Sequence, residues 1–147
     1  MRNAFLDRVQ VSEEINKLTE RIIGCGMAVS NTLGVGFLEK IYENALAHEL
    51  RKTGIFVQQQ AHVEVFYDGV VVGDYYPDLL VENSVIVELK AVSGLSNQEV
   101  AQCLNYLRAT GIPICLLLNF GRPRLEIKRV ANPLLNLPHI SQPGQLS

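Results

Sequence analysis

The stretch from Tyr76 to Val92 constrains the fold of this chain most, because it has the pattern of a β-hairpin. Two short apolar segments flank a polar turn near Asn83, with Asp78 on the first segment and Glu88 and Lys90 on the second. Because side chains of a strand alternate in direction, Glu88 and Lys90 project from one face. Two carboxylates and a lysine are costly on an apolar strand pair. Together they suit binding of a hard divalent cation and stabilisation of charge on a phosphoryl group.

The length of the turn decides whether these groups can meet. With a turn of two residues, Asn83 and Ser84, Asp78 faces away from Glu88. With an odd turn centred on Asn83, Asp78 lies directly opposite Glu88, because a slip of one residue moves every side chain to the other face. Two opposed carboxylates repel each other without a cation between them. A metal site on this hairpin therefore requires the odd register.

The length of 147 residues predicts a single domain with a buried core. We expect residues 1–131 to form this domain and residues 132–147, with three prolines and little periodicity, to form a loosely held tail. The N-terminal residues carry charge where a secretory signal is apolar, and the longest apolar runs are too short to cross a bilayer. The sequence therefore predicts a soluble cytoplasmic protein without a membrane partner.

The net charge of −2 argues against a strongly basic protein that coats DNA, because nonspecific affinity comes mainly from neutralised phosphates. A nuclease is compatible with this charge, since an acidic metal site subtracts from the formal sum. One basic cluster consists of Arg122, Arg124, Lys128 and Arg129. Solvated strand ends and a track for phosphates explain this cluster equally well.

Hydrophobic periodicity predicts a mixed α/β domain. Helical spacing covers residues 12–33, with Ser12 as the candidate N-cap, and also residues 37–52 and 96–110. Strand patterns cover residues 56–67, 70–76, 78–82, 85–92, 114–120 and 125–130. The first four strands are expected to form an antiparallel meander, with Asp68-Gly69 as a hairpin turn. The predicted fold class is α/β (an α+β mixed sheet), with helices packed on a mixed β-sheet.

The cysteines and histidines give no sign of a metal or nucleophile site. Cys25, Cys103 and Cys115 lie among apolar neighbours and form no Cys-x-x-Cys motif. We interpret them as buried reduced thiols rather than zinc ligands. The three histidines show no ligand spacing and have no obvious Ser or Cys partner.

The sequence resembles a known nuclease superfamily at the same hairpin. Pro77-Asp78 and Glu88-Leu89-Lys90 are similar to the motif that names the PD-(D/E)XK superfamily. The segment from Gly36 to Tyr42 resembles the signature of its GxxExxY protein family, and the likeness extends from about Ile22 to Val130. The chain departs from that family at Ser30, where the family has a histidine. The resemblance implies a restriction-endonuclease-like core.

The resemblance also implies a set of catalytic and metal-binding residues. Asp78 and Glu88 would bind Mg²⁺ or Mn²⁺, with the Leu89 carbonyl as a further ligand. Lys90 would position or help to deprotonate the attacking water, or neutralise the phosphate, and the sequence does not separate these roles. Glu39 is the candidate for an acid that reaches the metal from the helix before the sheet. Its alternative explanation is a favourable acid at a helix N-terminus.

Three further residues are candidates for substrate binding. Gln102 and Tyr106 lie four residues apart on one helix face, and they resemble the Gln-x-x-x-Tyr motif of recombination-type exonucleases. Their alternative is an ordinary polar helix edge. Tyr42 lies one helical turn after Glu39, and it is either a substrate contact or a core aromatic with a satisfied hydroxyl.

The leading functional hypothesis is metal-dependent hydrolysis of phosphodiester bonds in DNA or RNA. Nucleic acid is the expected partner, and a homodimer or a partner protein would supply further grip. The main alternative is a non-catalytic binding or assembly module that retains the fold, because fold does not determine function. Hydrolysis of a small nucleotide is a third possibility.

Overall fold

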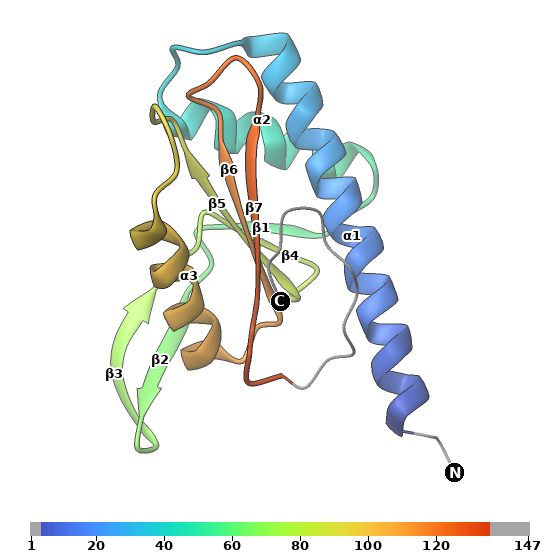
Figure 1. Ribbon diagram of the computed structural model, residues 1–147, viewed down its shortest axis with the longest axis vertical. Coiled ribbons are helices and arrows are strands. Elements are labelled where there is room, and N and C mark those ends of the chain that lie inside the picture. The colour runs from blue at the N-terminus through green and yellow to red at the C-terminus, as the bar shows by residue number, and fades with distance from the viewer. Residues whose placement is uncertain (1–3, 136–147) are drawn as a thin grey trace.

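The computed structural model describes residues 4–135, with side chains described from residue 12 onward (Figure 1). The helices are α1 (Ala4–Leu33), α2 (Glu39–Lys52) and α3 (Asn97–Thr110). The strands are β1 (Val57–Gln59), β2 (Val63–Tyr67), β3 (Val70–Tyr75), β4 (Leu79–Val81), β5 (Val85–Lys90), β6 (Ile114–Asn119) and β7 (Glu126–Ala131). No helix in this part of the chain is long and apolar enough to span a membrane.

Five of the strands form one mixed sheet, in the order β1-β4-β5-β6-β7. Only β5 and β6 pair in parallel, and α3 connects them because parallel neighbours require a crossover. Every residue of β6 is buried, as its unbroken apolar run predicts for a central strand. The mixed α/β architecture predicted from the sequence is confirmed.

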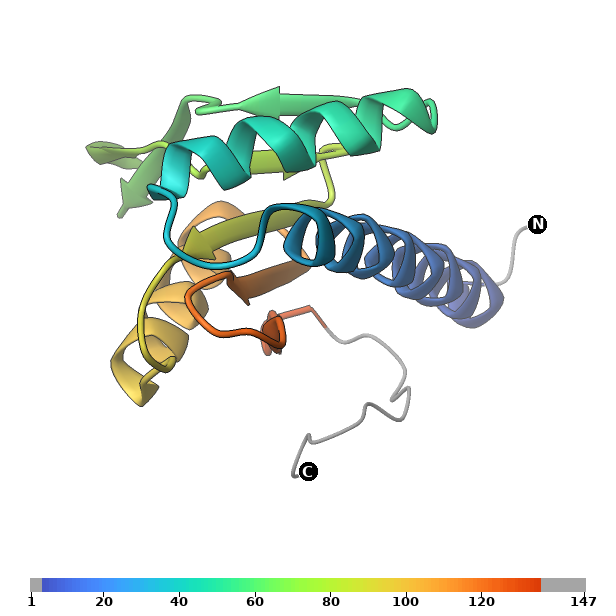
Figure 2. The same cartoon turned by 90° about the horizontal axis from the view of Figure 1, so that it is seen from above.

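The sheet separates two hydrophobic clusters. Side chains of α1 and α2 pack against one face, including alternate β5 residues Val85, Val87 and Leu89. The other face carries Ile86 and is covered by α3 through Leu107. Figures 1 and 2 show α3 and α1 on opposite sides of the central strands. Because β5 alternates between these clusters, Glu88 and Lys90 lie on the α3 face, in phase with Ile86.

Two predicted elements differ from the observed ones. Helix α1 begins at Ala4, so Ser12 lies inside the helix and is not its N-cap. The physical reason is that no glycine or proline precedes Gly24 to end a helix, so the helical segment starts earlier than the apolar pattern showed.

The predicted strand over residues 56–67 is also wrong, because β1 and β2 belong to different sheets. The break lies at Gln60, which has a φ of 53° and donates its backbone N–H to Asp78 O. The Asp68-Gly69 hairpin is present, but β2 and β3 form a separate two-stranded sheet that extends away from the main sheet (Figure 1). The antiparallel meander is therefore replaced by a hairpin inserted between β1 and β4.

The C-terminal part of the domain is closed by Asn132. This residue is buried, and its side-chain amide donates to Leu107 O and Ile112 O. The predicted tail falls mainly on residues 136–147, which lie outside the described residues. Packing of the domain thus continues at least to Asn132.

Candidate active site

The β4–β5 hairpin has the odd register that a metal site requires. Val81 pairs with Val85 and Leu79 pairs with Val87, which leaves a three-residue turn centred on Asn83. The next pair along the two chains is Asp78 with Glu88, on the α3 face of the sheet. The turn is feasible because Asn83 has a φ of 54°, a left-handed conformation that asparagine tolerates better than most residues. The register predicted for a metal site is confirmed.

Asp78 and Glu88 form a close pair of acids. Oδ2 of Asp78 accepts a hydrogen bond of 2.9 Å from the backbone N–H of Leu89, and the hydroxyl of Tyr75 donates to Oε1 of Glu88 at 2.5 Å. Burial, followed by the charge of Asp78, raises the pKa of Glu88 to about 7. A carboxyl group with this pKa is electrostatically unsatisfied, as is common at functional sites.

Lys90 shares a cavity of about 120 Å³ with Glu88. The cavity lies between the sheet, α3 and the β2–β3 hairpin, and it is lined by Tyr75, Glu88, Lys90, Glu99, Gln102, Cys103, Tyr106 and Leu117. Within the described residues, no salt bridge engages the Lys90 ammonium group. The lysine is therefore available to an anion that enters the cavity.

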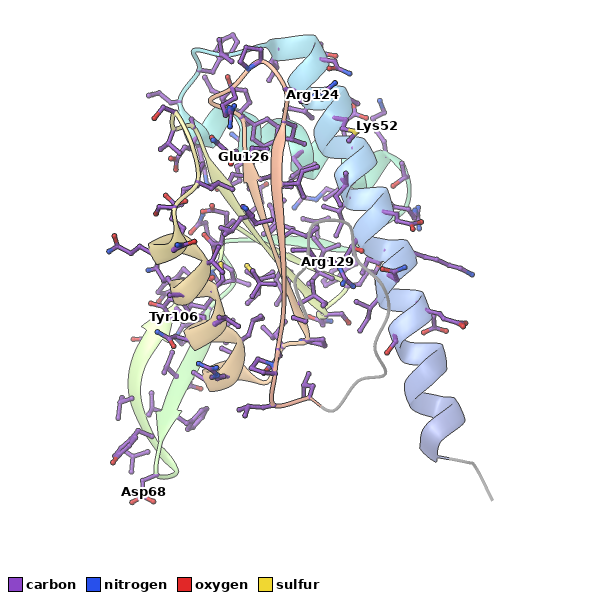
Figure 3. The ribbon with its side chains drawn as sticks, in the orientation of Figure 1. Lys52, Asp68, Tyr106, Arg124, Glu126 and Arg129 are labelled. Atoms are coloured by element: carbon purple, nitrogen blue, oxygen red, sulfur yellow. The ribbon has the colours of Figure 1, made fainter. Side chains whose placement is uncertain are left out.

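Gln102 and Tyr106 project from α3 into the same cavity. The ring of Tyr106 stacks on Tyr75 with centroids 3.7 Å apart and an interplanar angle of 11° (Figure 3 labels Tyr106). This stack joins α3 to the hairpin and closes one wall of the cavity. The structure thus brings two of the three predicted substrate-binding residues into one cavity with Glu88 and Lys90.

Tyr42 has a different position. It is fully buried, its hydroxyl donates to Gly34 O at 2.6 Å, and its ring stacks on Phe120 with centroids 4.8 Å apart. This arrangement matches the core alternative that the sequence left open. A side chain in this position has no surface to offer a substrate.

Glu39 is exposed in the first turn of α2 and is not grouped with Asp78 and Glu88. The acid that α2 directs toward the site is Glu43, which is only 4% exposed. Its Oε1 accepts a 3.0 Å hydrogen bond from Nε2 of Gln60, and the same Nε2 lies 3.2 Å from Oδ1 of Asp78. A single amide nitrogen therefore bridges two carboxylates from different elements.

Sequence reasoning missed Glu43, Gln60 and Tyr75 as residues of the site. Glu43 was visible as the helical neighbour of Glu39, four residues on, but its burial depends on how α2 packs against β1. Gln60 belongs to a run of glutamines, which weakened the alternating pattern of the strand predicted over residues 56–67 and gave no sign of a site. Tyr75 reaches Glu88 from a hairpin outside the main sheet, so no local pattern marks it.

The cysteines near the site are free thiols. The Sγ atoms of Cys103 and Cys115 lie 3.0 Å apart in the interior, while Cys25 is only partly buried. The hydrogen bond from Cys115 to Cys103, together with burial, raises the pKa of Cys115 well above its usual value. A thiol with a raised pKa is a poor nucleophile, so the sulfur of Cys115 serves packing.

The sequence over residues 16–130 matches the family model of the PD-(D/E)XK nuclease superfamily. The chain belongs to this superfamily. Its five-stranded mixed sheet with flanking helices is the restriction-endonuclease-like fold of PD-(D/E)XK nucleases, which generally depend on a divalent metal. No curated protein matches the sequence.

Solved structures resemble this PD-(D/E)XK chain at low identity. SSO0001 is similar with a TM-score of 0.52 and 18% identity, over 64% of this chain and 50% of that chain. An alkaline exonuclease from Laribacter hongkongensis gives a TM-score of 0.48 at 15% identity, over 63% of this chain and 55% of that chain. Its complex with dAMP gives 0.49 at 15% identity, with the same coverage. The chain spans about half the length of these structures, and the likeness at such identity concerns the fold alone.

The donor atoms at the hairpin fit a hard divalent cation. Asp78 and Glu88 offer carboxylate oxygens, which Mg²⁺ and Mn²⁺ prefer, and a cation would offset the burial and the facing charge of Asp78 that raise the pKa of Glu88. Within residues 4–135, no group of three or more His, Cys, Asp or Glu side chains is arranged to hold a metal. A cation at this pair would therefore need water or backbone oxygen as further ligands, which is usual for Mg²⁺.

Proposed function

We propose that this protein is a metal-dependent nuclease that hydrolyses phosphodiester bonds of DNA or RNA. The supporting observation is the odd register of the β4–β5 hairpin, because it sets Asp78 against Glu88 on the face where Lys90 also lies. A pure scaffold has no need for two opposed carboxylates in a half-buried position, since their repulsion destabilises the fold. An enzyme that binds a cation between the two carboxylates does need them, because the cation offsets their repulsion.

Asp78 and Glu88 would hold Mg²⁺ or Mn²⁺, and the carbonyl of Leu89 is a proposed further ligand. A bound divalent cation lowers the pKa of a bound water and neutralises charge on phosphoryl oxygens. Glu43 is a proposed outer member of the site, because its hydrogen bond to Gln60 fixes the amide that meets Asp78. Glu39 stays a weaker candidate for the same purpose, since it is exposed and lies one helical turn before Glu43.

The remaining side chains would act on the substrate. Lys90, unpaired among the described residues, is positioned to neutralise a phosphate that enters the cavity or to orient the attacking water. Gln102 and Tyr106 line the same cavity and would fix the phosphate relative to Lys90. Tyr75 donates to Glu88 and orients that carboxylate. Each of these roles needs only groups that already face one cavity.

We further infer that the chain belongs to the GxxExxY branch of the superfamily. The segment from Gly36 to Tyr42 supports this inference, because it fits that signature and has a structural reason to be retained. Tyr42 stabilises the α1–α2 loop, because its hydroxyl donates a hydrogen bond to Gly34 O and accepts one from the backbone N–H of Phe37.

The cavity, of about 120 Å³, holds little more than a phosphate group. We therefore propose that a second copy of the chain or a partner protein provides further contacts with the nucleic acid.

Cleavage assays with purified protein test the proposal. Single- and double-stranded DNA and RNA are incubated with Mg²⁺, Mn²⁺ or EDTA, for the parent chain and for Asp78→Ala and Lys90→Ala. We expect cleavage that requires the metal and is lost in both variants. Asp68→Asn is the matched control, because Asp68 lies in the turn of the β2–β3 hairpin, at the end away from the site (Figure 3).

Two results would contradict the proposal. Cleavage that survives both substitutions would come from a contaminating nuclease. Absence of cleavage together with absence of Mn²⁺ binding by calorimetry, in a chain that folds normally by circular dichroism, would favour the non-catalytic binding module.

A further inference from the structure

An exposed pair of stacked aromatic rings lies beside the candidate active site. The rings of His62 and Tyr76 have centroids 5.2 Å apart and an interplanar angle of 25°. The side chain of His62 is 49% exposed and Tyr76 is 54% exposed. Large exposed aromatic surface is costly to leave in water, so a preformed stack at the surface calls for a ligand.

The pair is joined to Asp78 through both of its chain segments. Tyr76 precedes Asp78 by two residues, and His62 follows Gln60 by two residues. Gln60 is itself bonded to Asp78 through its backbone N–H, at 3.1 Å, and its side chain, at 3.2 Å. Two extended residues span at most about 7 Å, so the rings lie within reach of a nucleotide whose phosphate is at Asp78.

We propose that His62 and Tyr76 form a platform on which an unpaired nucleobase stacks next to the bond that is cleaved. This inference rests on the proposed nuclease function and narrows the substrate to single-stranded nucleic acid or to strand ends with unpaired nucleotides. A base offers its flat face to a protein only when it is unstacked from its neighbours, and stacking on aromatic rings tolerates any base.

The charges around the platform suit a base better than a phosphate. Nε2 of His62 lies 2.5 Å from Oδ1 of Asp74, and this contact holds the imidazole ring against Tyr76. The carboxylate of Asp74 beside His62 would repel a phosphate at the platform itself, whereas stacking involves the uncharged face of the base. The phosphate would then lie toward Lys90, which lines the cavity.

Other exposed aromatic side chains lack this combination of features. Tyr67 is 75% exposed and Phe66 is 53% exposed, but both lie at the turn end of the β2–β3 hairpin, next to Asp68. Neither ring stacks on another aromatic ring among the described residues. Tyr67 is therefore a matched control for Tyr76, because it is the same residue type, exposed, and distant from the site.

The experiment measures stacking directly with an oligonucleotide that contains 2-aminopurine, whose fluorescence falls when it stacks. All proteins carry Asp78→Asn so that the oligonucleotide stays intact, and they are compared with additional Tyr76→Ala, Tyr76→Phe, Tyr76→Leu or Tyr67→Ala. We expect quenching by the Asp78→Asn protein, by Tyr76→Phe and by Tyr67→Ala. Tyr76→Ala and Tyr76→Leu should lose the quenching and bind the single strand about ten-fold more weakly.

The outcomes separate this inference from the proposed function. Equal quenching and affinity in Tyr76→Ala and its parent would overturn the platform, as would equal binding of a single strand and a blunt duplex. Metal-dependent cleavage that is unchanged by Tyr76→Ala would keep the nuclease and overturn the platform. Quenching that depends on Tyr76, together with absence of cleavage by the chain in which Asp78 is intact, would keep the platform and refute the nuclease.

Discussion

Glu88 and Glu126 lie in the same sheet, on β5 and β7, but their pKa values are shifted in opposite directions. Glu126 pairs with Asn119 across β7 and β6, and Asn119 pairs with Lys90 across β6 and β5. Oε1 of Glu126 accepts hydrogen bonds from Nδ2 of Asn119 and from the backbone N–H of Leu95, and the first of these lowers its pKa. Burial and a facing carboxylate raise the pKa of Glu88 instead.

Glu126 belongs to a cluster of polar groups around Asn119, and the amide of Asn119 has all of its hydrogen-bond partners in this cluster. Its oxygen accepts from the backbone N–H groups of Val92 and Gly121, and its nitrogen donates to Val92 O and to Glu126. An amide side chain has no further hydrogen-bonding capacity. The comparison teaches that buried polar groups with all partners present stabilise this fold, whereas a buried carboxyl group that faces a second carboxylate, as Glu88 does, is of the kind that is common at functional sites.

The largest expected effect is the loss of catalysis when a residue of the Asp78, Glu88 and Lys90 site is substituted. Lys90→Ala should lower kcat by about 10²–10⁴-fold, the range for a group that positions or activates the nucleophile. Its Tm should stay the same or rise, because Lys90 has no ion pair within the described residues that the substitution would break. Parallel measurement of cleavage rate and thermal unfolding checks both statements. A Tm that falls together with kcat would make Lys90 a structural residue.

A substitution in the cluster around Asn119 should show the opposite result, a loss of stability without a loss of catalysis. Asn119→Ala leaves backbone groups of Val92 and Gly121 without partners in the interior, so it should lower the free energy of unfolding by about 2–4 kcal/mol. Urea denaturation measures this loss. The folded fraction should retain its cleavage rate, and a change of less than about 0.5 kcal/mol would end the contrast between the clusters.

The third prediction concerns pH in the absence of metal. Because the folded-state pKa of Glu88 is raised to about 7, the folded protein binds a proton more tightly than the unfolded chain does. The contribution of Glu88 to stability is therefore fully present below the ordinary pKa of Glu and is lost as the pH rises through 7, in total by up to about 3 kcal/mol. Glu88→Gln should remove this fall. Mn²⁺ should restore stability above pH 7 in the parent chain alone, as calorimetric unfolding across pH would show.

The smallest expected effect concerns Glu126. Because its pKa is lowered, its contribution to stability is present at neutral pH and is lost as the pH falls through the lowered pKa. Glu126→Gln should therefore lower the Tm at pH 7 by no more than about 3 °C and leave it unchanged in acid. A pH dependence with the same sign as that of Glu88 would show that the two environments are alike.

The sequence predicted most of the fold because its signals are local. Helix α3 is an example, since Ser96 and Glu99 form a capping box and Gly111 ends the helix with a φ of 76°. The separation of β2 and β3 from the main sheet was not predictable, because it depends on the left-handed turn at Gln60 and on packing against α3. Propensity describes a strand but does not say which sheet it joins.

The candidate site also contains some residues that local sequence patterns indicated and others that they did not. Strand alternation put Glu88 and Lys90 on one face and helical spacing put Gln102 and Tyr106 on one helix face, while their assignment to one site, together with Asp78, came from the family resemblance. Glu43 and Tyr75 were missed because they enter from α2 and from the hairpin, and tertiary packing alone brings them near. The sequence left two alternatives open for both Glu39 and Tyr42, because exposure or burial on a helix depends on its neighbours in the fold.

The three-residue turn at residues 82–84 has a consequence for the evolution of this chain. It lies at the opposite end of β4 from Asp78, yet its parity decides whether Asp78 faces Glu88. Substitutions there should be neutral for cleavage as long as residues 82 and 83, which both have positive φ, can keep their conformation. Gain or loss of a single residue should abolish the reaction without unfolding the domain, so viable length changes in descendants of this chain should come in twos.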